Sequence, residues 1–227
     1  MNVLLDSKEG RDRFLRSVND SVFFELAPCF TPQVNPYYCG IASLSMILNA
    51  LTSEGFDLSP FQEKNEFLTF TQDNLLNRDT DQSVKKRSVI LKQEKPSGDD
   101  LESDSFDPGI SLVDMGKLVS FYHLDFVLHR LGQFQDKCVN EFREAVICSL
   151  SNKAGYLLCN FYGKALGETT GGHFSCPAVF DEKTDSILML DVARHKTSWY
   201  WVNLVDFVKS MALPHGKRGW IQIRKRK

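Results

Sequence analysis

Three apolar segments follow one another closely in the last third of the chain, and they limit its possible folds more than any other feature. They cover residues 155–161, 173–180 and 186–192. Each has the length of a strand, and the polar residues 183–185 provide a hairpin turn between the last two. Helical patterns precede them over 8–20, 41–51, 111–122 and 138–150, with one short strand pattern over 126–128. Helices first and antiparallel strands later predict an α+β fold, completed by a helix over 204–213 and a strand over 220–223.

Cys39 lies where a polar, proline-containing stretch changes into the apolar helix over 41–51. A thiol at a helix N-terminus is close to free backbone N–H groups and to the positive end of the helix dipole, which favours the thiolate. Gln33, six residues upstream, has a side-chain amide that can donate a hydrogen bond to an oxyanion. A buried cysteine that only begins a helix shows the same pattern. The surroundings of Cys39 therefore leave a catalytic and a structural interpretation open.

His173 begins one of the late strands, and Asp191 ends the next. If a short hairpin joins these strands, both side chains lie at the same end of the sheet. The carboxylate would then hold the imidazole in the tautomer that accepts a thiol proton. Taken singly, the histidine is also consistent with a structural role and the aspartate with a turn. Together with Gln33 and Cys39, however, they follow the order of the catalytic residues in papain-like cysteine proteases, with Asp in place of the frequent Asn.

Composition excludes several classes of function. The formal net charge of the 227 residues is −2, so no basic field predicts a nucleic-acid partner. No segment reaches the roughly 18 apolar residues of a membrane-spanning helix. The first residues do not resemble a signal peptide, which predicts a cytoplasmic protein and leaves signal-independent secretion open. The six cysteines include no CxxC pair, and reduced thiols are expected.

A chain of this length supports one sizeable core, and we predict a single domain over residues 1–227. Residues 77–108 interrupt it with a polar stretch that has too few apolar side chains to order itself. We expect a surface insertion there, either mobile or acting as a lid over the site. No spacing of His, Cys or carboxylate residues matches a zinc site, so no protein metal site is predicted.

These segments together resemble the phytochelatin synthase family, in particular its short bacterial-type members, which lack the cysteine-rich C-terminal extension of the plant enzymes. The resemblance covers most of residues 27–223. The segments that carry it are QVNPYYCGIASL (33–44), FTQDN (70–74), GHFS (172–175), LDVARHK (190–196) and RGW (218–220).

The resemblance implies a papain-like fold with a thiol acyltransferase or peptidase activity on glutathione. Cys39 would attack the Cys–Gly bond, and His173 would protonate the departing glycine. Gln33, with the backbone N–H of Cys39, would stabilise the oxyanion, and Asp191 would orient His173. The γ-glutamylcysteinyl group would then pass from Cys39 to a second glutathione, giving a phytochelatin, or to water, giving γ-glutamylcysteine.

The resemblance also implies binding residues and partners. Gly172, Arg194, Lys196 and Arg218 would contact glutathione, whose carboxylates suit fixed cations. No tightly bound cofactor is expected. Heavy metal ions such as Cd²⁺ or Zn²⁺ would act as activators through the thiolates of glutathione. A homodimer is consistent with the family.

Some residues depart from the family pattern. Pro32 replaces a hydroxyl residue, and Cys176 separates a serine and a proline that are usually adjacent. Cys176 is an odd offset from His173 on the strand, so we expect it in the core. Thr197 replaces a tyrosine on the expected acceptor side, which bears on transfer more than on hydrolysis. Two alternatives remain open: a papain-like protease or isopeptidase for a protein substrate, and a non-enzymatic metal or thiol buffer.

Overall fold

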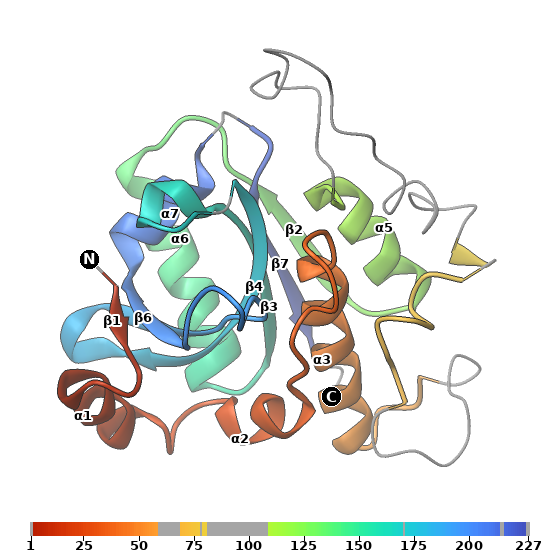
Figure 1. Cartoon of the computed structure of the whole chain (residues 1–227), viewed down its shortest axis with the longest axis horizontal. Coiled ribbons are helices and arrows are strands. Elements are labelled where there is room, and N and C mark those ends of the chain that lie inside the picture. The colour runs from red at the N-terminus through yellow and green to blue at the C-terminus, as the bar shows by residue number, and fades with distance from the viewer. Residues whose placement is uncertain are drawn as a thin grey trace.

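Seven strands form one antiparallel sheet at the centre of the protein (Figure 1). The computed structural model describes residues 2–58, 69–77, 79–80, 109–169, 171–213 and 216–225. The strand order is β1-β6-β5-β4-β3-β7-β2. The strands are β1 (Val3–Leu4), β2 (Phe126–Arg130), β3 (Gly155–Tyr162), β4 (Gly172–Asp181), β5 (Ser186–Leu190), β6 (Tyr200–Asn203) and β7 (Gly219–Arg224).

Helices cover both faces of this sheet. Figure 1 shows α3 and α5 on one side, and α6 and α7 on the other. On the second side Phe142 of α6 packs against Phe207 of α7. Phe142 also meets Trp220 of β7 edge to face, and Phe207 packs against Phe161 of β3. The α-helices among the described residues are α1 (Lys8–Ser17), α2 (Phe23–Leu26), α3 (Cys39–Ser53), α5 (Leu112–Phe121), α6 (Asp136–Val146) and α7 (Leu204–Met211).

The central helix α3 is buried on every side. All thirteen residues from Cys39 to Leu51 are buried. A helix that is apolar around its whole circumference belongs in the interior of a protein, because it has no polar face to expose. Its polar residues find partners: the side chain of Asn49 exchanges hydrogen bonds with the backbone of Phe70 (2.8 and 2.9 Å).

Strands β4 and β5 form the predicted hairpin. Its turn is a short 3-10 helix (Glu182–Thr184) followed by Asp185 at φ 47°. Pro177 lies where the pairing of β4 with β3 has ended, and the register with β5 shifts just after it. Proline has no N–H to donate, so it fits a strand only where a ladder is interrupted. The irregularity therefore follows from the sequence.

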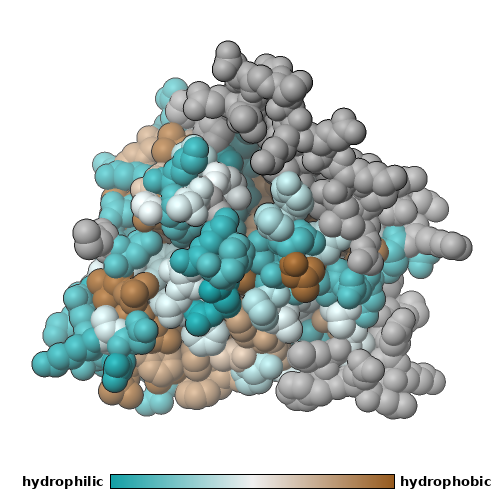
Figure 2. Space-filling model, in the orientation of Figure 1, coloured by the Kyte–Doolittle hydropathy of each residue, from teal (hydrophilic) through white to brown (hydrophobic). Residues whose placement is uncertain are grey.

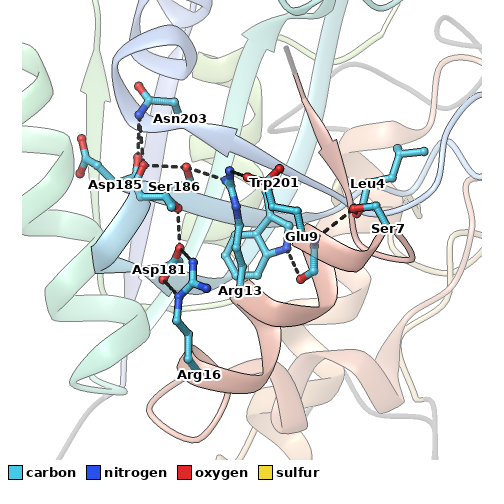
Figure 3. Close-up of polar contacts among 12 residues, drawn as sticks. Leu4, Ser7, Glu9, Arg13, Arg16, Asp181, Asp185, Ser186, Trp201 and Asn203 are labelled. Carbon is cyan, nitrogen blue, oxygen red and sulfur yellow. Dashed lines mark hydrogen bonds and ion pairs between the residues drawn. The ribbon is translucent and has the colours of Figure 1, made fainter.

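The N-terminal helix α1 is fastened to the far end of this hairpin (Figure 3). Arg16 donates two hydrogen bonds to the buried carboxylate of Asp181 (2.8 and 2.5 Å). The indole N–H of Trp201 in β6 donates to the Gly10 carbonyl (3.0 Å), and Arg13 donates to Ser186 (3.1 Å). These contacts tie a segment that comes first in the chain to strands that come last.

The N-terminal elements also carry exposed hydrophobic side chains. Leu4, Leu15 and Phe24 of β1, α1 and α2 are 44%, 71% and 60% exposed. Figure 2 shows hydrophobic surface along the lower and left part of the face drawn, where these elements lie, and a separate hydrophobic patch just right of its centre. The N-terminal elements thus carry one of the hydrophobic areas of this face.

The predicted α+β class is confirmed, and most predicted elements are present. The predicted strand over 186–192 ends at Leu190, because the chain turns at Asp191. The predicted helix over 138–150 ends at Val146 and continues as a π-turn (Ile147–Ser151). The short elements β1, β6 and α2 were not predicted. The segment 77–108 lies almost entirely outside the described residues. Within the described part of the chain, no helix has the length and apolar character to cross a membrane.

Candidate active site

Cys39 is the first residue of α3, and a turn fixes how the chain enters this helix. The side chain of Asn35 accepts a hydrogen bond from the Tyr37 backbone N–H (2.9 Å), and its carbonyl accepts one from the Tyr38 N–H (3.3 Å). Such an Asx turn sets the direction of the following backbone. Cys39 is 8% exposed, so its thiol is almost enclosed at the end of the helix where free N–H groups point.

The neighbouring Gly40 allows α3 to pack closely at this point. A Cβ atom on Gly40 would lie 2.6 Å from Met115 Cε, 2.8 Å from Ile110 Cγ2 and 3.2 Å from Phe174 Cδ2. The first two distances are too short for carbon atoms, so a larger residue would require the side chains of Met115 and Ile110 to move. Glycine here lets these side chains pack directly against the N-terminus of α3.

His173 and Asp191 are in direct contact. The imidazole Nε2 lies 3.0 Å from Oδ1 of Asp191 and 3.2 Å from Oδ2. His173 is the second residue of β4, and Asp191 directly follows β5, whose Leu190 pairs with Cys176 of β4. The two side chains are 2% and 0% exposed. The Ala193 backbone N–H donates to Asp191 Oδ1 (2.7 Å), which holds the carboxylate in place.

The contact favours an ion pair. Burial lowers the pKa of His173, but the carboxylate of Asp191 and a hydrogen bond with Cys39 outweigh burial and hold that pKa well above its ordinary value. Burial raises the pKa of Asp191, but His173 and the Ala193 N–H hold it below its usual range. Because Nε2 faces Asp191, Nδ1 is the ring nitrogen left for the thiol of Cys39. The structure thus brings thiol, imidazole and carboxylate into one chain of contacts.

Gln33 lies in the turn that precedes Cys39. Its backbone N–H donates to the Val192 carbonyl (2.9 Å), one residue after Asp191. Its side-chain Nε2 donates to the Asn35 carbonyl (2.8 Å), which leaves the second hydrogen of the amide for another acceptor. Its Oε1 is buried and has no hydrogen-bond partner among the residues that the structure describes. The amide is therefore placed close to the site with hydrogen-bonding capacity still available.

Gln72 supports this turn, a role that the sequence did not reveal. Its Oε1 accepts from the Val34 backbone N–H (3.0 Å), and its Nε2 donates to the Pro32 carbonyl (2.9 Å). One buried amide thus bridges the residues on both sides of Gln33 and fixes the segment.

Two of the predicted binding residues lie beside His173. Gly172 faces Arg218 so closely that a Cβ atom on Gly172 would lie 3.0 Å from Nη2 of Arg218. The guanidinium of Arg218 lies 5.3 Å from the ring centroid of Tyr162 and donates to the Leu213 carbonyl (2.7 Å). The guanidinium of Arg218 is therefore held next to Gly172, the first residue of β4.

The other two lie on the loop after Asp191. Lys196 is close enough for its charge to contribute to lowering the pKa of Asp191. Arg194 is exposed, and its guanidinium lies 5.7 Å from the ring centroid of Trp199. The four predicted binding residues thus lie on both flanks of the imidazole–carboxylate pair.

Comparison with known proteins agrees with this arrangement. A family model described as phytochelatin synthase matches residues 1–220. The chain belongs to the phytochelatin synthase family. It is 31% identical over 209 residues to a glutathione gamma-glutamylcysteinyltransferase of Schizosaccharomyces pombe, covering 91% of this chain and 44% of the relative. It is 28% identical over 210 residues to a Lotus japonicus protein of that name, numbered 1 (90% and 36%). An Arabidopsis thaliana relative, numbered 2, is 28% identical over 203 residues (87% and 38%).

The family resemblance predicted from the sequence is thereby confirmed. The chain spans less than half the length of these relatives. Of the residues that depart from the family pattern, Cys176 is fully buried in the core, as predicted. Its thiol points at the Ser43 carbonyl of α3 (3.6 Å), and burial raises its pKa. The extra cysteine of this family member is a packing residue.

A cavity of about 740 Å³ borders the site of this phytochelatin synthase family member at Asp191. Lys196 and Thr197 line it from the loop after β5, and Leu166 and Glu168 line it from the loop before β4. A cavity of this size accommodates a small peptide. Among the described residues, no group of three or more His, Cys, Asp or Glu side chains is placed to hold a metal ion.

Proposed function

We propose that this chain is a thiol acyltransferase that acts on glutathione through a papain-like arrangement of Cys39, His173 and Asp191. One observation carries the proposal: a buried imidazole–carboxylate contact beside a thiol at a helix N-terminus. A buried ion pair of this kind costs desolvation energy, and such pairs with perturbed pKa values gather at functional sites. Membership of the family supports glutathione as the substrate.

In the first half-reaction, Cys39 acts as a thiolate paired with the His173 imidazolium. The sulfur attacks the carbonyl of the Cys–Gly peptide bond of glutathione, and a tetrahedral oxyanion forms. The Gln33 amide and the Cys39 backbone N–H donate to this oxyanion. The imidazolium gives its proton to the glycine nitrogen, the C–N bond breaks, and glycine leaves. A γ-glutamylcysteinyl thioester remains on Cys39, and His173 is neutral.

In the second half-reaction, an acceptor attacks the thioester. Water or the amine of a second glutathione loses a proton to His173 as it bonds to the carbonyl carbon. The C–S bond then breaks, and the thiolate–imidazolium pair is restored. Asp191 keeps the ring oriented and stabilises its charged form in both halves. Heavy metal ions enter as thiolate complexes of the acceptor glutathione, and are therefore part of the substrate.

Four residues are assigned to binding of the substrate. Arg218, held over Gly172, and Arg194 supply guanidinium groups that suit the carboxylates of glutathione. Lys196 supplies a further positive charge next to Asp191. The absence of a side chain on Gly172 lets the Arg218 guanidinium lie beside His173, where it would contact the substrate.

Glycine release tests the proposal. The purified chain is incubated with glutathione, with and without Cd²⁺ or Zn²⁺, while free glycine and product masses are followed. We expect glycine together with γ-glutamylcysteine, γ-glutamylcysteinyl oligomers, or both. Oligomers that increase with metal indicate transfer, whereas glycine without oligomers indicates hydrolysis.

Cys39→Ala is the decisive variant. Loss of the nucleophile is expected to lower glycine release by at least about 10⁴-fold. Circular dichroism and thermal unfolding serve as the control for an intact fold. Glycine release at the normal rate by Cys39→Ala contradicts the assignment of the nucleophile. No glycine release by the unmodified chain favours the alternative of a protease for protein substrates.

A further inference from the structure

The turn that carries Gln33 has little packing of its own to hold it in place. Residues 31–34 belong to no helix or strand. Pro32 and Val34, on either side of Gln33, are exposed, Val34 by 66%. The Gln33 backbone N–H is fixed by the Val192 carbonyl (2.9 Å), but the backbone groups before and after it need other partners. The position of the Gln33 amide therefore depends on the hydrogen bonds of its two neighbours.

Gln72 supplies those hydrogen bonds. It is 6% exposed, whereas Thr71 and Asp73 next to it are exposed, so its side chain is turned inward. The Pro32 carbonyl can only accept a hydrogen bond, and the Val34 N–H can only donate one. The amide of Gln72 has both a donor and an acceptor, and it satisfies the two groups at once, at 2.9 and 3.0 Å. An apolar side chain or a carboxylate in its place could not do so.

The segment that carries Gln72 is in turn anchored to α3. The side chain of Asn49 in α3 exchanges two hydrogen bonds with the backbone of Phe70 (2.8 and 2.9 Å). The turn over residues 71–74 is closed by reciprocal hydrogen bonds between its two ends (2.8 and 3.2 Å). Because Cys39 begins α3, these contacts connect the helix that carries the thiol to the turn that precedes it.

We propose that Gln72 is a positioning residue, which fixes where the oxyanion donor Gln33 lies relative to the thiol of Cys39. The inference rests on the proposed function and adds a residue that affects the reaction only through Gln33. Without the Gln72 amide, the Pro32 carbonyl and the Val34 N–H lose their partners. Since both residues lie at the surface, the turn can rotate toward water to satisfy these groups, and the Gln33 amide moves with it.

Gln72→Met tests this role, because methionine has a similar length and no amide. A displacement of about 1 Å can cost roughly 10²-fold in rate, so we expect kcat for glycine release to fall about tenfold to a hundredfold. The KM for glutathione should change less than about threefold, since the donor acts on the intermediate. Gln222→Met is the matched control: the buried amide of Gln222 in β7 donates to Ser149 Oγ (3.0 Å). Both variants should lose thermal stability, but only Gln72→Met should lose kcat.

A double-mutant cycle shows whether Gln72 acts through Gln33. Gln33→Ala removes the donor, so Gln72→Met in that background should lower kcat by less than about threefold. If the losses of the two single variants multiply in full, Gln72 acts independently of the oxyanion donor, and the inference is overturned. A normal kcat in Gln72→Met alone overturns it as well.

Alkylation by iodoacetamide separates the donor from the thiol. A thiolate attacks this reagent at a saturated carbon, so no oxyanion forms and Gln33 has no part in the step. The alkylation rate of Cys39, followed by mass spectrometry of its peptide, should therefore be the same in Gln72→Met and in the unmodified chain. An alkylation rate that falls as much as kcat would mean that Gln72→Met displaces the thiol itself, which overturns the inference.

The two proposals fail in distinguishable ways. An unmodified chain that releases glycine, with a kcat that Gln72→Met leaves unchanged, overturns the inference and leaves the proposed function standing. An unmodified chain that releases no glycine overturns the proposed function, and the inference falls with it.

Discussion

The contact between His173 and Asp191 determines what each group can do in the site. Both side chains are buried, so each charge would be costly without the other. The Ala193 N–H compensates part of that cost by donating to the carboxylate (2.7 Å). Removal of the carboxylate therefore changes the charge of the imidazole as well as its orientation.

Asp191→Asn should alter the pH profile as well as the rate. Asp191 holds the pKa of His173 well above its ordinary value, so the imidazolium form persists to high pH. With Asn, the pKa of His173 falls, and the basic limb of the rate profile for glycine release should move to lower pH. The rate at the optimum should fall by roughly 10²–10⁴, since an aspartate that orients a catalytic histidine contributes up to about 10⁴. Steady-state glycine release between pH 5 and 10 measures both effects.

Asp20→Asn, at an exposed position, is the control for loss of one negative charge. An Asp191→Asn profile that has the normal basic limb and only a lower rate would mean that the carboxylate orients the ring without setting its charge.

Gln33→Ala tests the oxyanion donor. The Gln33 amide retains a free N–H after its bond to the Asn35 carbonyl. Removal of one such donor from a tetrahedral intermediate lowers kcat by roughly 10²–10³. Glycine release under saturating glutathione measures kcat, and the KM for glutathione should change much less. A normal kcat would remove Gln33 from the chemistry and leave it as a residue of the turn.

Local sequence pattern was enough to predict three site residues: Cys39, His173 and Asp191. Each lies at a boundary that the pattern marks, namely the start of a helix, the start of a strand and the end of a strand. The contact between Glu168 and Tyr200 was not accessible, since it joins a loop residue to the first residue of β6, 32 positions away. Gln72 belongs to the segment 70–74 that resembles the family, but the sequence predicted no role for it. Its two hydrogen bonds to the turn around Gln33 span about 40 residues, and no local periodicity encodes such a contact.

At the scale of elements, the hairpin of β4 and β5 carries His173 and Asp191 at one end and contacts α1 through Asp181 at the other. His173 is the second residue of β4, and Asp181 is the last residue of the same strand. Asp181 accepts hydrogen bonds from Arg16, Ser17 and Thr184. The position of the hairpin relative to α1 therefore depends on one buried carboxylate.

Asp181→Asn should lower the free energy of unfolding more at neutral pH than at acidic pH. Burial raises the pKa of Asp181, but the hydrogen bonds from Arg16 and Thr184 outweigh burial and hold it below its ordinary value. A carboxyl group with a lowered pKa stabilises the folded protein at pH values above its ordinary pKa of about 4. This contribution to stability is lost as the pH falls through the lowered pKa. The variant should lose about 2 kcal/mol at pH 7, less than for a fully buried pair because Arg16 is 34% exposed.

Urea unfolding at pH 7 and at pH 3 measures this effect. The difference between the normal protein and Asp181→Asn should shrink at the lower pH, where the carboxylate becomes protonated. An equal loss at both pH values would mean that packing, and not the charge of Asp181, holds α1 to the hairpin.

The sequence predicted long elements better than short ones. Helix α3 was predicted over 41–51 and extends over Cys39–Ser53, since its apolar residues recur without a break. Strand β1 has only two residues, Val3–Leu4, and β6 has four, so neither shows a period of its own. The pairing of β7 with both β3 and β2 joins the end of the chain to its middle, and strand order of this kind is set by the whole core.

Across the whole molecule, we expect the six cysteines to divide into four that only pack and two that react with thiol reagents. Cys29, Cys138, Cys159 and Cys176 are buried in the core, and none of the six is in a disulfide. Cys148 is exposed on the turn after α6. Cys39 is 8% exposed, much like Cys138 (7%), and differs from it by its hydrogen bond with His173. We expect that contact, and not exposure, to make Cys39 more reactive than the four thiols of the core.

A thiol titration should reveal this division. An aromatic disulfide reagent such as 5,5′-dithiobis(2-nitrobenzoate) is expected to label two thiols in the native protein and the remaining four only after unfolding. Cys148→Ser should leave one rapidly labelled thiol, and Cys39→Ala together with Cys148→Ser should leave none. Rapid labelling of a third thiol in the native protein would mean that the core opens at a cost far below that of global unfolding.

Protection by a substrate analogue tests where the ligand binds. Prior incubation with S-methylglutathione, which has no free thiol to consume the reagent, should slow labelling of Cys39 and not of Cys148, because only Cys39 lies in the proposed substrate site. Equal protection of both thiols by S-methylglutathione would instead place the ligand away from α3.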